Sequence, residues 1–228
     1  MSTSSSHSNK FGMLTVFVFV GFLMSMGMVT LTILNTDVGQ YHKVESPATI
    51  VAELSGDSNL LMMDLVGVAL DNLFIIGYFS IFYGIYLLTR RTDKILSTTA
   101  FSLGISTAIF DIIENSFLIT LFTGVPVNFT PESLVFSLQW LATSIKDISS
   151  YISGALFVLL LLVGMNTPPE LRMRKITLAL FLVLYVVLGS LGIVGSIFLT
   201  LRNLLFVIDM FVALVIFYSL KNADIEGS

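Results

Sequence analysis

Six long apolar stretches fill most of this chain, and they restrict its fold more than any other feature of the sequence. A helix needs about 20 apolar residues to cross the hydrocarbon core of a bilayer, and each stretch is close to that length or longer. Charged residues make up 11% of the chain, against about 25% in soluble domains. We therefore predict an all-α, polytopic membrane protein that forms a six-transmembrane-helix bundle. The predicted spans are 11–34, 60–89, 95–122, 131–164, 176–198 and 203–220.

The segments outside these spans are polar and mostly short. Residues 1–10 are rich in Ser and are predicted to form a disordered tail, and residues 221–228 form a second tail. Within the longest polar segment, Ser46-Pro47 is typical of a helix start and predicts a short interfacial helix at about 47–55. The first span is too long for the apolar part of a cleaved signal peptide, so we expect it to be retained.

The distribution of Lys and Arg predicts the orientation of the bundle, because cytoplasmic loops carry an excess of both residues. With the N-terminus inside, two of these residues, Lys43 and Arg202, fall in outer segments. The cytoplasmic segments hold Lys10, Arg90, Arg91, Lys94, Arg172, Arg174, Lys175 and Lys221. We therefore predict an N-in/C-in multi-pass protein of the plasma membrane. The glycosylation sequon at Asn128 then faces outside, and we interpret it as a chance match.

Ionisable residues inside the apolar spans are the second informative feature. In Phe110-Asp111-Ile112-Ile113-Glu114-Asn115, two carboxylates and an amide interrupt the third span. An ionisable side chain at the bilayer centre costs roughly 2.5–3.5 kcal/mol on insertion scales, and such residues usually mark functional sites. Other parts of the chain must therefore offset this cost.

Polar residues on the second, third, fourth and sixth spans lie at similar depths and on one face of each predicted helix. On the third span, for example, Asp111 and Glu114 continue a stripe that begins at Gly104. We predict that the four stripes face one pocket that opens toward the outside. Its predicted ligand- or ion-binding residues are Asp71, Asn72, Asp111, Glu114, Asn115, Lys146, Asp147 and Asp209. Its predicted rim residues are Asp64, Gln139 and Arg202.

This pocket has an excess of negative charge, because its carboxylates outnumber Lys146 and Arg202. Some carboxylates must be protonated or neutralised by a bound cation. Oxygen ligands favour a hard cation, and Asp71, Asp111 and Glu114 are the expected ligands if a metal binds. Cys is absent and both His residues lie outside the spans, so a zinc site is not expected. Haem and nucleotide motifs are also absent.

A purely structural interpretation of the same residues is a polar network. Lys146 would then pair with Asp111 or Glu114, and Asp209 would pair with Arg202. Polar interactions between transmembrane helices average about 0.6 kcal/mol each, which is small beside the insertion cost. Lys146 beside Asp147 is typical of an internal ion pair rather than of a Schiff-base or proton-relay lysine.

The first and fifth spans are predicted to be scaffold. Both carry small-residue faces suited to close helix contact, formed by Gly21 and Ser25 on the first and by Gly189, Gly192 and Gly195 on the fifth. The second span carries an aromatic stripe that is predicted to pack in the core or against lipid, composed of Phe74, Tyr78, Phe82 and Tyr86.

Three functions are compatible with this sequence. The preferred prediction is a small transporter or channel-like protein for a cation or protons, centred on Asp71, Asp111, Glu114 and Lys146. One alternative is a membrane-embedded enzyme acting on a lipid or polyprenyl substrate, with no catalytic residue assigned. The other is a non-catalytic subunit or receptor of a membrane complex. Expected partners are the bilayer, a small ion or polar solute, and a second copy or another subunit, but not nucleic acid, because no basic run is present.

Overall fold

The computed structural model describes residues 4–34, 58–124, 134–192 and 196–221 of the chain. Within these residues the chain is helical and contains no strand. The helices are α1 (Ser4–Leu34), α3 (Ser58–Thr89), α4 (Lys94–Gly124), α5 (Leu134–Val163), α6 (Pro169–Leu191) and α7 (Ser196–Lys221). These 6 helices are long and apolar enough to cross a membrane, which suggests a multi-pass membrane protein. The prediction of an all-α chain with six apolar helices is confirmed.

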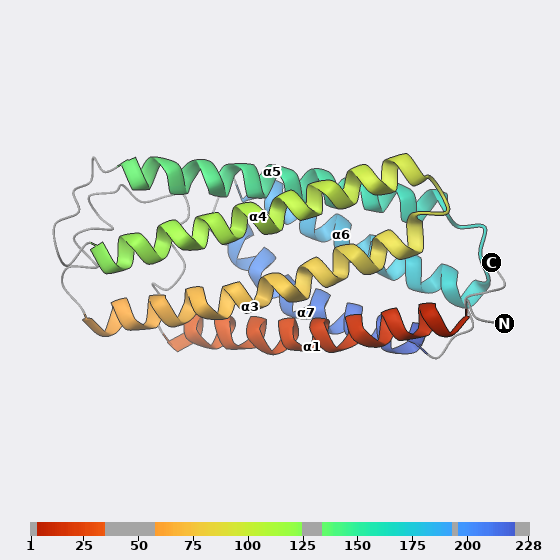
Figure 1. Cartoon of the computed structure of the whole chain (residues 1–228), viewed down its shortest axis with the longest axis horizontal. Coiled ribbons are helices and arrows are strands. Elements are labelled where there is room, and N and C mark those ends of the chain that lie inside the picture. The colour runs from red at the N-terminus through yellow and green to blue at the C-terminus, as the bar shows by residue number, and fades with distance from the viewer. Residues whose placement is uncertain (1–3, 35–57, 125–133, 193–195, 222–228) are drawn as a thin grey trace.

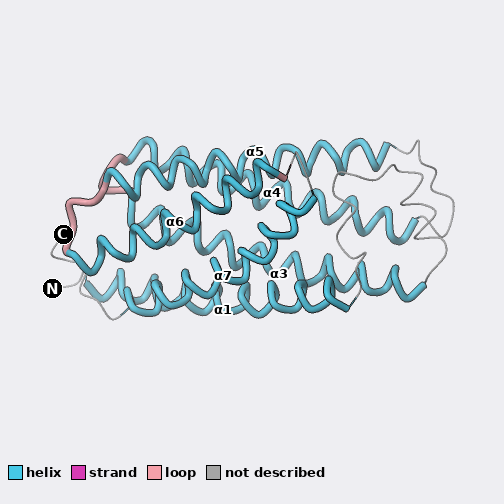
Figure 2. The backbone as a smooth tube through the Cα atoms, turned by 180° about the vertical axis from the view of Figure 1, so that it is seen from behind, coloured by secondary structure: helices cyan, strands magenta, loops and turns pink. Residues whose placement is uncertain are grey.

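The helices form a closed ring in chain order. Each packs against the next one along the chain, and α7 packs against α1. α3 also contacts α5 and α7 across the ring. Figure 1 shows an elongated bundle with α4 and α5 along one edge, α1 along the opposite edge and α3 between them. The α3–α4 and α5–α6 connections, pink in Figure 2, lie at the same end of the bundle.

Local sequence signals explain where two of the helices begin. The Asp93 carboxylate accepts a hydrogen bond from the backbone N–H of Leu96 at 2.9 Å, and this bond caps the first turn of α4. α6 begins with proline at its first positions and Glu170 in its first turn, both of which favour a helix start. Lys175 of α6 donates from Nζ to the carbonyl of Gly164 at 2.7 Å, which satisfies a backbone group just beyond the end of α5.

Large apolar side chains cover the outside of the bundle as well as fill its core, and ionisable side chains are buried inside. Ile95, Val163 and Leu134 are 81%, 75% and 69% exposed, whereas Asp111 and Glu114 are buried inside the ring. Lipid-facing helices show this arrangement, because ionisable residues in such helices turn toward the bundle interior. The polar residues of the interior are therefore the place to look for a functional site.

Small residues allow α1, α3 and α7 to approach closely. A Cβ atom added to Gly21 would lie 2.6 Å from the Cα of Gly77 and 3.3 Å from the Met210 sulfur. On the opposite side of the ring, a Cβ on Gly189 would overlap the ring of Tyr151. Gly21 and Gly189 of the small-residue faces predicted on the first and fifth spans thus lie at helix contacts within the chain. Gly195 lies outside the described residues.

The N-terminal end of α1 differs from the prediction. α1 begins at Ser4, so the segment expected to be a disordered tail is helical from that residue onward. Extending an existing helix fixes one residue for each new hydrogen bond, which is much easier than starting a helix. The predicted interfacial helix at 47–55, the sequon at Asn128 and the tail beyond 221 lie outside the described residues.

The last two helices also differ from the prediction. α6 runs from Pro169 to Leu191 instead of 176–198, because the basic residues that were assigned to a loop belong to its first turns. α7 begins at Ser196 instead of 203, so Arg202, which was assigned to an outer segment, lies inside the helix. α6 ends at Leu191, with Gly192 as the residue that follows its last turn.

Candidate functional site

Lys146 of α5 lies between two carboxylates of α4. Its Nζ is 2.9 Å from Oδ1 of Asp111 and also contacts Oε2 of Glu114. Asp111 and Glu114 are three residues apart and therefore share one face of α4. The side chains of Asp111 and Glu114 are 7% and 0% exposed, and that of Lys146 is 19% exposed. One ammonium group thus pairs with two buried carboxylates.

Neutral donors hold the same two carboxylates. The hydroxyl of Tyr78 donates to Oδ2 of Asp111 at 2.8 Å. The hydroxyl of Thr143 donates to Oε1 of Glu114 at 2.7 Å, and the amide of Gln139 reaches the same oxygen at 3.4 Å. Each carboxylate is therefore oriented by a neighbouring helix as well as by the ammonium, as expected of a connected polar network.

A third carboxylate joins this group through an amide. Asn115 donates from Nδ2 to Oδ2 of Asp71 at 2.8 Å and lies 3.3 Å from Oδ1 of Asn72. Because Asn115 follows Glu114 directly on α4, this contact brings the acidic part of α3 to the Lys146 ion pairs. We call the resulting group the Lys146 cluster; its members are Asp71, Asn72, Tyr78, Asp111, Glu114, Asn115, Gln139, Thr143 and Lys146.

A second group of contacts surrounds Arg202 of α7. A guanidinium nitrogen lies 3.7 Å from Oδ1 of Asp147 and donates to the hydroxyl of Tyr151 at 3.0 Å. The guanidinium carbon lies 5.6 Å from the centre of the Phe206 ring, within the range of a cation–π contact. Lys146 and Asp147 are consecutive on α5, so this helix carries one partner of each ion-paired group.

Helix α6 reaches the interior near the Arg202 contacts. The hydroxyl of Tyr185 donates to the hydroxyl oxygen of Ser150 at 2.7 Å, and the Ser150 hydroxyl donates to the carbonyl of Asp147 at 2.8 Å. Both tyrosine rings of this region are in contact, with the centres of Tyr151 and Tyr185 5.7 Å apart. α6 therefore contributes to the polar interior, although its span was predicted to be scaffold.

Two predicted members of the pocket are set apart from these groups. Asp209 lies seven residues after Arg202 on α7, about 10 Å further along the helix. Its Oδ1 is buried and has no hydrogen-bond partner among the described residues. The predicted pairing of Asp209 with Arg202 is wrong, because the guanidinium turns to Asp147. Asp64 is buried at 3% exposure and precedes Asp71 by about 10 Å along α3.

The residues predicted to form an exposed rim are instead part of the interior. Asp64 and Gln139 are 3% and 4% exposed, and the Arg202 side chain is 17% exposed. Arg202 is covered because α7 begins a turn and a half before it, at Ser196. Gln139 is covered because its amide turns toward Glu114 of the neighbouring helix.

The geometry of the described carboxylates does not form a metal site. Over residues 4–34, 58–124, 134–192 and 196–221, no group of three or more His, Cys, Asp or Glu side chains could hold a metal ion. Asp71, Asp111 and Glu114, the expected ligands of any metal, are instead linked through the Lys146 ammonium and the Asn115 amide. The arrangement binds an ammonium group and can take up protons.

Several residues of the two groups were not among the predicted site residues. The sequence contained a signal for Tyr78, because it follows Asp71 by seven residues and shares its helix face. It was interpreted as part of a packing stripe, and its ring does pack between Phe74 and Phe82. Tyr151 carried a similar signal, because it follows Asp147 by four residues on one helix. For Tyr185 no such signal exists, since its role depends on how α5 and α6 pack together.

Tyr78→Phe tests whether the Tyr78 hydroxyl supports the buried carboxylate. The substitution keeps the ring contacts and removes one hydrogen bond to Asp111, so we expect a loss of about 1.5–3 kcal/mol in the free energy of unfolding. Thermal unfolding of the purified protein measures this loss. Tyr83→Phe on the same helix is the control, because the Tyr83 ring stacks on Tyr86 without a described hydroxyl bond. Equal losses in the two variants would contradict the assignment.

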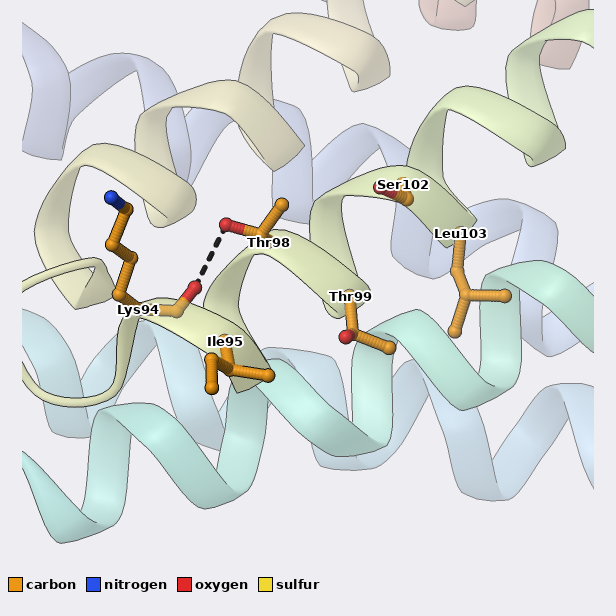
Figure 3. A pocket seen from close by; sticks show the side chains of 6 residues that line it. All are labelled: Lys94, Ile95, Thr98, Thr99, Ser102 and Leu103. Carbon is orange, nitrogen blue, oxygen red and sulfur yellow. Dashed lines mark hydrogen bonds between the residues drawn. The ribbon is translucent and has the colours of Figure 1, made fainter.

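A separate recess follows the first turns of α4 and is shown in Figure 3. Its lining consists of Lys94, Ile95, Thr98, Thr99, Ser102 and Leu103. All these residues come from one helix, and the Thr98 hydroxyl is already bonded to the carbonyl of Lys94 at 2.8 Å. The recess holds no carboxylate, so we place the functional site at the Lys146 cluster.

Comparison with known proteins gives no further guide to the site. The chain matches no protein family, no curated protein and no solved structure. Its function is therefore argued from the geometry of the Lys146 cluster.

Proposed function

We propose that this protein is a small multi-pass membrane transporter for a cation or protons, and that the Lys146 cluster is its ion-binding site. The observation that supports this proposal is the ammonium of Lys146 bound between Asp111 and Glu114 inside an apolar bundle. Ionisable side chains are expensive inside a bilayer, and they usually mark an ion pathway or a proton relay. A polar network between helices returns only about 0.6 kcal/mol per interaction, which is small beside the insertion cost of these groups.

The charge balance of the cluster explains how it would take up its substrate. Asp71, Asp111 and Glu114 face one ammonium group, so ionisation of all three would leave an excess of negative charge. Binding a proton or a cation from outside neutralises this excess, and release restores it. Binding and release each change the carboxylates that pair with Lys146. Because these groups lie on α3, α4 and α5, the contacts among the three helices depend on whether the site is occupied.

The proposed orientation is N-in/C-in in the plasma membrane, as the Lys and Arg distribution predicts. Asp71, Asp111 and Lys146 then lie about 18–20 Å from the outer ends of their helices and about 25–27 Å from the inner ends. Below them, toward the inside, Ile85, Phe157, Leu160 and Leu161 are at most 2% exposed and form a dry apolar core. In this proposed orientation the site is closer to the outer side, and apolar side chains separate it from the inside.

Flux in proteoliposomes tests this proposal. An imposed pH gradient is followed with an entrapped pH-sensitive dye, in buffers with and without monovalent cations. We expect Asp111→Asn and Glu114→Gln to lower the flux by about tenfold or more, equivalent to at least about 1.4 kcal/mol of barrier. Asp93→Asn is the matched control, since it makes the same chemical change at an exposed helix cap where Asn is as good a residue as Asp.

Folding of each variant is checked separately by its elution profile and unfolding temperature. If Asp111→Asn and Glu114→Gln stay folded and carry the flux of the wild-type protein, the cluster is not a transport site. A wild-type flux no greater than that of empty liposomes under every gradient would also reject the proposal.

A further inference from the structure

The geometry points to the chemical class of the transported cation: we infer that Asp111 and Glu114 form a binding site for a primary ammonium ion, and that Lys146 is its built-in competitor. This inference rests on the proposed function, because it names the substrate class of that site. It also explains why a lysine, rather than a neutral residue, lies between the two carboxylates.

The site already holds the chemical group that it is proposed to bind. The tip of Lys146 is a primary ammonium with three N–H donors and no acceptor. It donates to Oδ1 of Asp111 at 2.9 Å and forms an ion pair with Oε2 of Glu114, so one nitrogen serves both carboxylates. A free alkylammonium ion presents the same charge and the same donors on a similar carbon substituent. The oxygens that bind the lysine tip are therefore suited to such an ion.

The two carboxylates are oriented without help from Lys146. Asp111 is held by the Tyr78 hydroxyl at 2.8 Å, and Glu114 is held by the Thr143 hydroxyl at 2.7 Å. These bonds occupy Oδ2 of Asp111 and Oε1 of Glu114, whereas the ammonium binds Oδ1 and Oε2. Departure of the lysine tip would leave the second oxygen of each carboxylate in place, facing the same position.

Lys146 is also placed to leave. Its side chain is 19% exposed, whereas those of Asp111 and Glu114 are 7% and 0% exposed, so part of the lysine side chain reaches the surface of the bundle while the two carboxylates stay inside. A lysine ammonium is a strongly hydrated point charge on a flexible four-carbon stem. It can swing out of the site while its backbone stays in α5, and an incoming ammonium ion then takes its position.

Unfolding temperatures of Lys146→Ala test this inference. Removing the Lys146 ammonium leaves its position between the two carboxylates open to a free ammonium ion. Methylammonium chloride is therefore expected to stabilise the variant. A site filled at a hundredfold excess over Kd raises the unfolding temperature by about 5–10 °C in a chain of this size. Tetramethylammonium chloride and sodium chloride at equal ionic strength are expected to give no comparable rise, because neither cation has N–H donors. The wild-type protein is expected to respond less, since Lys146 occupies its site.

Lys175→Ala is the matched control. Lys175 is also a buried lysine, at 4% exposure, but its Nζ donates to the Gly164 carbonyl and forms no ion pair among the described residues. Methylammonium is therefore expected to give this variant no specific stabilisation. If methylammonium raised the unfolding temperature of Lys175→Ala as much as that of Lys146→Ala, the inference would be overturned. It would also be overturned if all three salts raised the unfolding temperature of Lys146→Ala equally, or if no salt raised it.

A pair of further variants covers the case in which Lys146→Ala does not fold. Adding Glu114→Gln to it removes one of the two charges that the lysine had balanced. In this double variant methylammonium is expected to raise the unfolding temperature by a smaller amount. When Asp111→Asn is added as well, the methylammonium-specific rise is expected to disappear. Equal shifts in the double and triple variants would reject the carboxylates as the binding groups.

The two proposals fail in different ways. The unfolding measurement needs no gradient. If methylammonium specifically raises the unfolding temperature of Lys146→Ala but no flux is found, the binding site stands and the transport proposal is rejected. If proton flux depends on Asp111 and Glu114 but methylammonium causes no specific rise in unfolding temperature, transport stands and the ammonium site is rejected.

Discussion

Lys146→Met is expected to lower the free energy of unfolding by about 3–5 kcal/mol. Met keeps most of the side-chain volume, but it leaves Asp111 and Glu114, at 5% and 0% exposure, without their shared cation. In a chain of this size the loss corresponds to a fall of about 6–20 °C in unfolding temperature. Thermal unfolding of the purified protein in lipid nanodiscs at neutral pH measures it.

A triple variant separates charge from packing. When Asp111→Asn and Glu114→Gln are added to Lys146→Met, no uncompensated charge remains at the ion pair. We expect most of the lost stability to return, because replacing a whole buried ion-pair group is often neutral, whereas removing one partner is not. A triple variant as unstable as Lys146→Met would show that Lys146 stabilises the bundle through its packing.

Gly21→Ala is expected to destabilise the protein by about 1–3 kcal/mol. Ala is otherwise preferred to Gly in a helix by up to about 1 kcal/mol, so the expected sign is the reverse of the intrinsic preference. The reason is that the new Cβ would lie 2.6 Å from the Cα of Gly77, and backbone cannot rotate away as a side chain can. Unfolding temperature or resistance to denaturing detergent measures the change.

Gly12→Ala, on the same helix, is the control for this substitution. Its Cβ would meet the flexible Lys221 side chain at 3.5 Å, an ordinary contact distance. We expect this variant to be as stable as the wild-type protein or more stable by up to about 1 kcal/mol. The same loss in both variants would contradict the close approach of α1 and α3 at Gly21.

Apolar length and helical periodicity were enough to predict the helices and part of the candidate site. Apolar runs of sufficient length predicted the helices, and the three-residue spacing of Asp111 and Glu114 placed both carboxylates on one face. Lys146 was the natural partner for either, because a charge buried among apolar helices needs an opposite charge. In the structure its ammonium contacts both.

Contacts that depend on helix register could not be predicted in the same way. Arg202 was expected in an outer segment, and its actual place inside α7 changes both its burial and its partner, from Asp209 to Asp147. Basic residues indicate a membrane surface only on average, so they misplaced the ends of α6 and α7. Tyr78 shows a different limit, since a tyrosine on an apolar face can serve packing and a hydrogen bond together.

The closed ring of helices has a consequence for how the protein is made. Because each helix packs against the next in the chain, most contacts are local, and successive hairpins can assemble as the ribosome delivers them. α7 is the exception: it emerges after the other five described helices and must pack against α1, which emerges before them. The same step brings Arg202 to Asp147. Until α7 arrives, Asp147 lacks this cation, so completion of the acidic interior and closure of the ring are one late event in biosynthesis.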